Sequence, residues 1–469
     1  MAKNAEIKTG FFMISRLGPL LAIFLLAFAC AALSQESNAD LLSPRLIRLR
    51  SEIQKDNTEK INKFWEEIGR KGTPMIETNL SDSNYCWVTF LWNDSTHTIR
   101  NVLVKLWHRI VFSHQSLLDN AKMVRLENSN IWYKTFRFKK DTRVSYQLSP
   151  NDDMIAIRGY SDQERWRKKA GGFIADPLNP KKYTALDGES SILELPGAPD
   201  GGWTYRNENI KHGKIDSSEF ISKILGNKRD IWVYLPSGYT KEKKYNLMVF
   251  LDGQPTGYSD IPAVNILDNL IAEKKIAPVI ALFIGNATGF RNTELSYNEA
   301  FANFISEEVV PKFLSRYSIT TDPSKNIIVG ASLGGNEAAL VAFRNPHLFG
   351  NVLTQSAGFM YRQKNIPFPF QPGDFQEYNF PETEWFTGLI RDHKKISLRF
   401  RIDVGLFEDI SWEEDHPRFG SPSLLLATRH LRDILKVKGY SVSYNEYSGG
   451  HEHLNWQYSL ADGLIWLSH

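Results

Sequence analysis

The segment I-I-V-G-A-S-L-G-G (residues 327–335) decides the fold of the C-terminal half of the chain. An apolar run typical of a strand leads into small residues around Ser332, and a helical pattern follows over Leu333–Arg344. A serine raised out of a sheet on a tight strand-to-helix turn needs small residues two positions to either side, so that the backbones can pass. The segment therefore predicts a nucleophile, Ser332, with the Leu333 N–H at the helix start facing a developing oxyanion.

Strands and helices alternate around this segment. Apolar strand patterns occur at Ile231–Leu235, Leu247–Leu251, Val279–Ile284, Asn326–Val329, Val352–Gln355, Ser397–Val404 and Ser441–Tyr447. Helical patterns occur at Phe301–Tyr317, Leu333–Arg344, Ser421–Val437 and Asn455–Leu467. Such alternation over roughly 240 residues predicts an α/β fold with a mostly parallel central sheet covered on both faces.

A nucleophilic serine needs a base, and His451 is the best placed of the eleven histidines. It follows the final strand and two glycines, and nucleophile, acid, histidine is the chain order of α/β-hydrolases. His453 is the alternative base, unless it only supports the site or lies on the surface. The H-x-H pattern has no third ligand nearby, so we expect no metal there.

The acid that orients the histidine should follow the preceding strand, Ser397–Val404. The sequence there is G-L-F-E-D (405–409), and we favour Glu408, with Asp409 as the alternative. Asp403 lies within the strand, where a structural role is expected. A Ser–His dyad without an acid also stays open.

A second oxyanion donor should come from the loop after Leu247–Leu251, where the sequence is L-D-G-Q-P (251–255). Glycine allows the backbone to approach a substrate closely. The N–H of Gly253 or of Gln254 is therefore the expected donor, with a plain turn as the alternative.

The N-terminal half of the chain has a different sequence pattern. Aromatic and β-branched runs at Cys86–Trp92, Ile99–Trp107, Ile131–Phe138 and Val144–Leu148 are separated by turn clusters, which predicts a small Ig-like β-sandwich. Residues 41–70 show amphipathic helical spacing, and 176–202 form a turn-rich connector. We expect a helical lead-in over 40–75, a sandwich with connector over 76–205 and a hydrolase domain over 206–469.

The first 39 residues predict a secretory signal. Lys3, Lys8 and Arg16 precede an apolar run over Leu17–Leu33, and A-x-A-like endings occur at Ala29 and Ala39. An uncleaved membrane anchor is the main alternative, and acylation of Cys30 is a further one. In each case we expect the catalytic part outside the cytoplasmic membrane, in the periplasm, and if the signal is cleaved we expect no stable membrane insertion.

The amino-acid composition argues against several classes of protein. The 469 residues are 42% hydrophobic, 12% aromatic and 23% charged, which argues against disorder and coiled coil. A net charge of +3 without a basic tract gives no support for nucleic-acid binding. The two cysteines, Cys30 and Cys86, cannot build a disulfide scaffold.

These motifs together resemble the enterochelin (enterobactin) esterases, within the esterase D group of α/β-hydrolases. The resemblance rests on F-L-D-G-Q (250–254), R-N-T-E-L-S-Y-N (291–298), V-G-A-S-L-G-G (329–335), S-G-G-H (448–451) and the segment W-R-K-K to I-A-D-P-L-N-P (166–180). It runs from about residue 80 to the end of the chain. The combination of the two domains is its most specific part.

The resemblance implies hydrolysis of the serine trilactone of a catecholate siderophore, usually iron-loaded, by Ser332, His451 and an acid in the Glu408 region. It places the oxyanion hole at the Leu333 and Gly253/Gln254 amides. It also implies that Arg291 holds the anionic catecholate complex, although Arg and Glu three apart on a helix pair readily, so that an Arg291–Glu294 ion pair is equally open. No cofactor is expected, since iron arrives with the substrate, and we expect a monomer.

Two other functions stay open. One is a different esterase, acting on feruloyl or acyl sugars, with sandwich tryptophans as a stacking platform; these are Trp87, Trp92, Trp107 and Trp132. Core packing is the other explanation for the tryptophans. The remaining possibility is a non-catalytic siderophore binder, against which the serine, histidine and acid argue.

Overall fold

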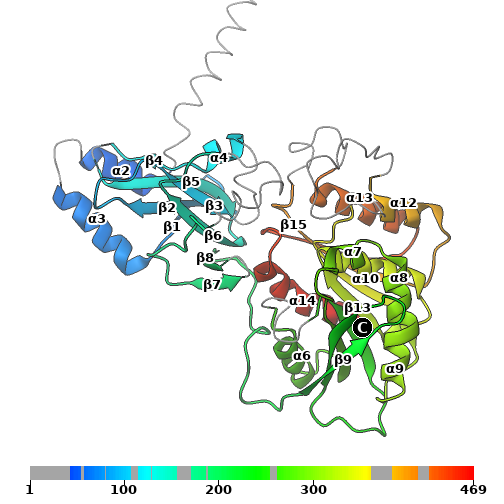
Figure 1. The fold of residues 1–469 in the computed structure, drawn as a ribbon. Helices are drawn as coiled ribbons and strands as arrows, with labels where there is room; N and C mark the ends of the chain where they lie inside the picture. Colours follow the sequence, from blue (N-terminus) through cyan, green and yellow to red (C-terminus); the bar gives the residue numbers. More distant parts are fainter. Residues whose placement is uncertain are drawn as a thin grey trace, which may run out of the picture.

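The computed structural model describes residues 43–53, 58–79, 81–106, 115–127, 129–155, 171–185, 188–253, 261–360, 383–409 and 422–469. The expected signal at 1–39 lies outside these residues. Among the described helices, none has both the length and the apolar character needed to cross a bilayer. An N-terminal part with two four-stranded sheets precedes a C-terminal part with one eight-stranded sheet (Figure 1).

The N-terminal part is a sandwich of two antiparallel sheets. The first has the order β1 (Met75–Thr78), β2 (Tyr85–Asn93), β5 (Ile131–Lys139), β4 (Val124–Arg125). The second has the order β3 (Val102–Leu106), β6 (Arg143–Pro150), β8 (Gly188–Glu194), β7 (Lys182–Ala185). Strands β7 and β8 lie in the stretch expected to be only a connector, and that expectation was wrong because β8 pairs with the distant strand β6.

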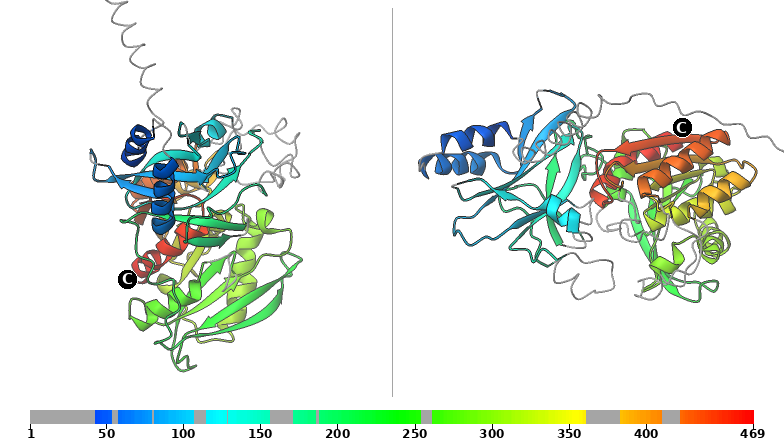
Figure 2. Two further views of the ribbon diagram at one scale, coloured as in Figure 1. Left: turned by 90° about the vertical axis from the view of Figure 1, so that its left-hand side faces the viewer. Right: turned by 90° about the horizontal axis from the view of Figure 1, so that it is seen from above.

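Side chains of β2 point alternately to the two faces of its sheet, so that one face packs on the second sheet and the other on helices. Val88 and Phe90 face the second sheet, and the Phe90 ring meets the Tyr146 ring edge-on at 4.7 Å. Leu91 points the other way, into a cluster with Leu46 of helix α2 (Pro44–Glu52) and Phe64 of helix α3 (Thr58–Lys71). These two helices are the expected amphipathic lead-in, and they lie on the side of the sandwich away from the eight-stranded sheet (Figure 2). The remaining helix here is α4 (Gln115–Ala121).

The eight-stranded sheet has six parallel strands and an antiparallel edge, as expected for an α/β-hydrolase. Its order is β16 (Ser441–Tyr447), β15 (Arg399–Gly405), β14 (Asn351–Gln355), β13 (Ile327–Ala331), β11 (Asn246–Leu251), β12 (Val279–Ile284), β10 (Lys228–Leu235), β9 (Lys214–Ile221). Strands β10 and β9 run antiparallel to their neighbours. Strand β9 was not predicted, since its sequence is mostly polar and exposed.

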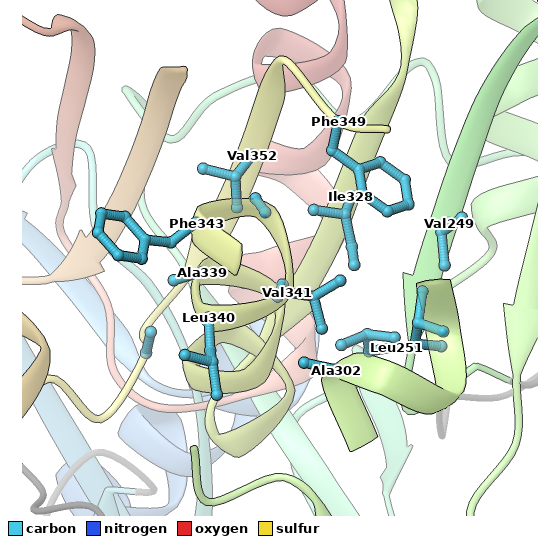
Figure 3. Packing of buried hydrophobic residues seen from close by; sticks show 14 of the residues in the cluster. Val249, Leu251, Ala302, Ile328, Ala339, Leu340, Val341, Phe343, Phe349 and Val352 are labelled. Carbon is cyan, nitrogen blue, oxygen red and sulfur yellow. The ribbon is translucent and has the colours of Figure 1, made fainter. Parts of the chain in front are cut away.

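Helices cover both faces of this sheet. Strand β11 sends Val249 and Leu251 to one face and Met248 and Phe250 to the other. The helices that cover the first face are α8 (Glu299–Asn303), a π-helical turn (Phe304–Val309), α9 (Val310–Leu314), α10 (Leu333–Arg344), α12 (Trp385–Asp392) and α13 (Leu424–Val437). A short helix, α7 (Arg291–Glu294), precedes α8 in the chain. The second face is covered by α6 (Ala263–Ala272) and α14 (His453–Ser468). Figure 3 shows α10 side chains packed against Ile328 and Val352.

Two local features depart from the helical predictions. The expected helix over 301–317 is divided by the π-helical turn, which ends just before Pro311 in α9. Proline has no N–H to donate to the preceding turn, so a regular α-helical ladder cannot continue through it. Short helices such as α6 and α12 were not predicted.

Candidate active site

Ser332 stands between strand β13 and helix α10 with a positive φ of 53° and a ψ of −127°. Non-glycine residues rarely adopt a positive φ, and such strain gathers at functional sites. The strand end is held in place because the Ser332 N–H donates to the Gln355 carbonyl oxygen at 2.9 Å. The sequence expectation of a serine on a sharp strand-to-helix turn therefore matches the observed backbone.

The glycines around Ser332 are required by close backbone contacts. A Cβ at Gly330 would lie 2.0 Å from the Gly334 carbonyl oxygen, and one at Gly335 would lie 2.8 Å from Ala357 Cβ. Real Cβ atoms essentially never approach other atoms so closely. A side chain at either position would therefore force the turn to shift from the observed geometry.

A chain of hydrogen bonds links Ser332 to a buried carboxylate through His451. His451 Nε2 lies 2.9 Å from Ser332 Oγ, and His451 Nδ1 lies 2.6 Å from Glu408 Oε1. A carboxylate only accepts, so its bond assigns the ring proton to Nδ1 and leaves Nε2 to accept from the serine hydroxyl. The three residues follow strands β13, β16 and β15, whose carboxyl ends meet at one edge of the sheet.

The Glu408 carboxylate is fixed from several sides. Its side chain is only 3% exposed, and Oε2 accepts from the Gly405 N–H at 2.6 Å and from Ser356 Oγ at 2.7 Å. The neighbouring Asp409 is exposed to solvent. Between the two carboxylates that the sequence left open, only Glu408 is placed beside His451.

Asp403, the third carboxylate near this strand end, is engaged elsewhere. Its Oδ1 accepts from Arg401 Nε at 2.7 Å, and burial raises the pKa of its carboxyl. This agrees with the structural role that its position within the strand suggested.

Three residues that support the acid were not found from the sequence. Ser356 Oγ lies 2.7 Å from the Tyr447 hydroxyl and accepts from Trp456 Nε1 at 2.9 Å. Because the single Ser356 proton goes to Glu408, Tyr447 donates to Ser356. Burial and the nearby Glu408 charge raise the pKa of Tyr447. No local motif marks these contacts, which span 52 to 100 residues of sequence.

His453, the alternative base, lies next to the site without taking the position of the base. Its ring meets the Trp456 ring edge-on at 4.8 Å. Burial, with contributions from the charges of His451 and Arg291, lowers the pKa of His453 to about 3. The contacts to Ser332 and Glu408 come from His451.

The two expected oxyanion donors have different outcomes. Leu333 is the first residue of α10, so its N–H has no acceptor within the helix itself. The Gly253 N–H instead donates to the Ile284 carbonyl oxygen at 2.8 Å. The prediction of Gly253 as a donor was therefore wrong, because the neighbouring strand already binds that amide. Gln254 lies outside the described residues.

Arg291 pairs with a residue that the helical spacing did not indicate. Its Nε and one terminal nitrogen donate to the two oxygens of Asp252, both at 2.7 Å. Glu294 is buried and binds Arg229 instead, at 2.8 Å. The alternative of an Arg291–Glu294 ion pair is therefore wrong. The new pair abuts the start of α10, since a Cβ on Gly334 would lie 3.0 Å from Asp252 Oδ2.

The described residues offer little other chemistry. No group of three or more His, Cys, Asp or Glu side chains there could hold a metal ion. Cys86 is a buried free thiol. Trp132 is buried in the sandwich core and Trp92 packs against it, which favours the packing role for these two tryptophans.

Comparison with known proteins agrees with this geometry. Residues 222–467 match a family model described as "Putative esterase", and residues 87–204 match one described as "Enterochelin esterase, N-terminal". An iron(III) enterobactin esterase of Dickeya dadantii is 26% identical over 426 residues, covering 86% of this chain and 92% of that protein. An iron(III) salmochelin esterase of Escherichia coli O6:H1 is 25% identical, covering 89% and 96%.

Among solved structures, a ferric enterobactin esterase from Salmonella typhimurium superposes with a TM-score of 0.67 at 24% identity. The superposition covers 87% of this chain and 98% of that one. This likeness shows that the two-part architecture of sandwich and hydrolase sheet is shared.

Proposed function

The chain belongs to the enterochelin esterase family of α/β-hydrolases and is a carboxylic ester hydrolase, and we propose that Ser332, His451 and Glu408 form its catalytic triad. Its substrate class is the catecholate siderophores that have an ester-linked trilactone backbone. The observation that carries the assignment of residues is the position of His451, which bridges the Ser332 hydroxyl and the buried Glu408 carboxylate.

Acylation follows from this geometry. His451 Nε2 takes the proton of Ser332 Oγ while the oxygen attacks an ester carbonyl, and Glu408 stabilises the resulting imidazolium at Nδ1. The Leu333 N–H, at the positive end of α10, supports the tetrahedral oxyanion. The imidazolium then protonates the departing seryl oxygen, which leaves an acyl-enzyme at Ser332.

Deacylation repeats these steps with water. His451 removes a proton from the water that attacks the acyl-enzyme, and then returns a proton to Ser332 Oγ. Each cycle opens one ester bond, so a trilactone passes through linear trimer and dimer to the monomer. The chain's own residues supply every proton transfer, and iron enters as part of the substrate.

Arg291 is the proposed contact for the anionic substrate. Asp252 fixes two of its nitrogens, while the side chain stays 35% exposed and close enough to His453 to affect its pKa. A ferric tris-catecholate carries about three negative charges, which a cation at this edge would attract.

Mass spectrometry of reaction products tests this function directly. The purified chain is incubated with ferric and with iron-free enterobactin, and Ser332→Ala serves as the control. Linear trimer, dimer and monomer from the wild type alone are the expected result. An intact trilactone together with hydrolysis of feruloyl sugars would assign the chain to the polysaccharide esterases. Binding of siderophore without hydrolysis of any ester would instead indicate a binder.

We also propose that the chain is exported and that the segment 1–39 is its signal. The support is the positive start, the apolar run over Leu17–Leu33 and the A-x-A-like endings. Expression in a Gram-negative host, fractionation and N-terminal sequencing test this. A periplasmic product that begins after Ala29 or Ala39 is expected; a cytoplasmic product that retains Met1 would contradict export.

A further inference from the structure

We propose that strand β6 of the sandwich positions the catalytic histidine, with Ser145 acting through Glu452 on its neighbour His451. This inference rests on the proposed function, because it concerns the geometry of the His451 base. It gives the sandwich a role in catalysis that does not require contact with the substrate. Helix α14, which begins just after the histidine, packs against β6 at the boundary between the two parts of the molecule (Figure 1).

The central contact is a buried carboxylate shared by the two parts. Glu452 is 3% exposed, although it lies between two histidines in a loop at the active site. Its Oε2 accepts from Ser145 Oγ at 2.5 Å, and its Oε1 accepts from the Ser145 backbone N–H at 3.2 Å. Asn455 Nδ2 also donates to Oε1, at 3.0 Å. Hydrogen bonds to a buried carboxylate are stronger than those between neutral groups, so Ser145 is a firm anchor.

A second contact holds the other side of the histidine. The Arg143 N–H, also on β6, donates to the Ser448 carbonyl oxygen at 3.2 Å. The Arg143 guanidinium stacks over the Tyr458 ring of α14, 3.6 Å from the ring centroid. The same guanidinium is fixed within the sandwich by Glu194. Strand β6 is therefore hydrogen-bonded to the loop at residues 448 and 452, on both sides of His451.

The loop that carries Glu408 is also attached to the sandwich. Phe407, the residue before Glu408, packs on the sandwich core, with its ring 5.8 Å from the Phe138 ring. The Phe407 N–H donates to the Gly449 carbonyl oxygen at 3.0 Å, which ties the acid loop to the histidine loop. Both partners of Ser332 therefore lie next to residues anchored in the sandwich.

The expected consequence is a loss in turnover rather than in substrate binding. Ser145 touches none of the reacting atoms, so it is a positioning residue. Small misplacements of a catalytic group reduce the chemical step strongly, because the reacting atoms must be aligned. Since every ester uses the same histidine, loosening the loop should lower kcat equally for a small aryl ester and for the large trilactone, with KM unchanged.

The test compares two serines of the same strand. Ser145→Ala removes the hydroxyl that binds Glu452, and Ser149→Ala removes an equally buried hydroxyl of β6 that binds Asp152 at 3.0 Å within the sandwich. The full chain is assayed with p-nitrophenyl butyrate and ferric enterobactin. Ser145→Ala should lower kcat by about tenfold on both esters, while Ser149→Ala stays within about twofold of the wild type. Ser145→Thr, which keeps the hydroxyl, should restore most of the activity.

A double variant tests the link from the other side, in case one substitution impairs folding. If Ser145 acts through Glu452, the double variant Ser145→Ala/Glu452→Ala should be no slower than Glu452→Ala alone. Equal losses for Ser145→Ala and Ser149→Ala would overturn the proposal, as would an unchanged kcat for Ser145→Ala or a loss confined to the trilactone. If the wild type hydrolyses aryl esters but not the trilactone, the siderophore assignment fails while this comparison still stands. A wild type inactive on every ester overturns both.

Discussion

The serine turn and the histidine loop meet at one active site, but the chain holds them in different ways. The turn around Ser332 is fixed by contacts within the hydrolase sheet, such as the bond from the Ser332 N–H to Gln355 and the packing of Gly335 on Ala357. The loop around His451 is fixed from outside that sheet, by Ser145, a residue 307 positions away from Glu452. A nucleophile can thus be built from one short segment, whereas its base depends on how two separate parts of the chain pack.

The largest expected effect comes from breaking either end of the Ser332–His451 hydrogen bond. Ser332→Ala and His451→Ala should each lower kcat on p-nitrophenyl butyrate by on the order of 10⁶-fold, because nucleophile and base act as a unit. The double variant should be no slower than either single one. A residual rate above about one hundredth of the wild type in Ser332→Ala would show that another nucleophile carries the reaction.

The next effect separates the two neighbouring carboxylates at the end of β15. Glu408→Gln keeps the shape but loses the charge that holds His451 in its working tautomer, so kcat should fall by about 10³- to 10⁴-fold. Asp409→Asn is the matched control, since Asp409 is exposed, and it should stay within about twofold of the wild type. The reverse pattern of losses would assign the acid to Asp409.

The serine turn and the loops that carry its two partner residues also differ in how far the sequence predicts them. The Ser332 turn was predictable because strand, small residues and helix follow one another within a few positions. The alternating strands and helices gave the α/β sheet for the same reason. The acid could be predicted only as either Glu408 or Asp409. Both carboxylates follow the strand, and the direction of each side chain depends on tertiary packing.

Contacts between distant segments account for what the sequence missed. Helical spacing suggested that Arg291 binds Glu294, but each side chain turns to a partner on another element, Asp252 and Arg229. The Gly253 amide faces a neighbouring strand whose position no local pattern reveals. The support that Ser356 gives to Glu408 was invisible for the same reason.

A smaller effect, on the free energy of unfolding, tests whether the serine turn can adapt to an added side chain. Gly330→Ala places a Cβ 2.0 Å from a backbone oxygen, so the turn must shift, and the free energy of unfolding should fall by about 3 kcal/mol. Gly388→Ala in α12 is the control, because its Cβ would meet only Arg391, at 3.8 Å, and it should be neutral or slightly stabilising. Urea unfolding measures both. Equal unfolding free energies for the two variants would mean that the turn adapts.

The smallest effect concerns pH and falls on the histidine loop. Burial lowers the pKa of His453 to about 3, so below its ordinary pKa near 6.5 the unfolded chain takes up a proton that the folded chain refuses. The stability that His453 contributes is therefore complete above pH 6.5 and declines as the pH falls toward 3. His453→Gln should remove this decline, so that between pH 7 and pH 5 the variant loses on the order of 1–2 kcal/mol less than the wild type.

Urea unfolding at several pH values checks this, with the exposed His347→Gln as the control that should keep the slope of the wild type. The helix behind the serine turn carries the opposite tendency, because burial raises the pKa of Glu337, whose contribution is lost as the pH rises. Glu337→Gln should therefore remove a decline in stability that begins near the ordinary carboxyl pKa of about 4.5 and continues as the pH rises. If His453→Gln and His347→Gln gave parallel curves, acid sensitivity would not arise in the histidine loop, and the contrast between the two regions would be confined to their packing.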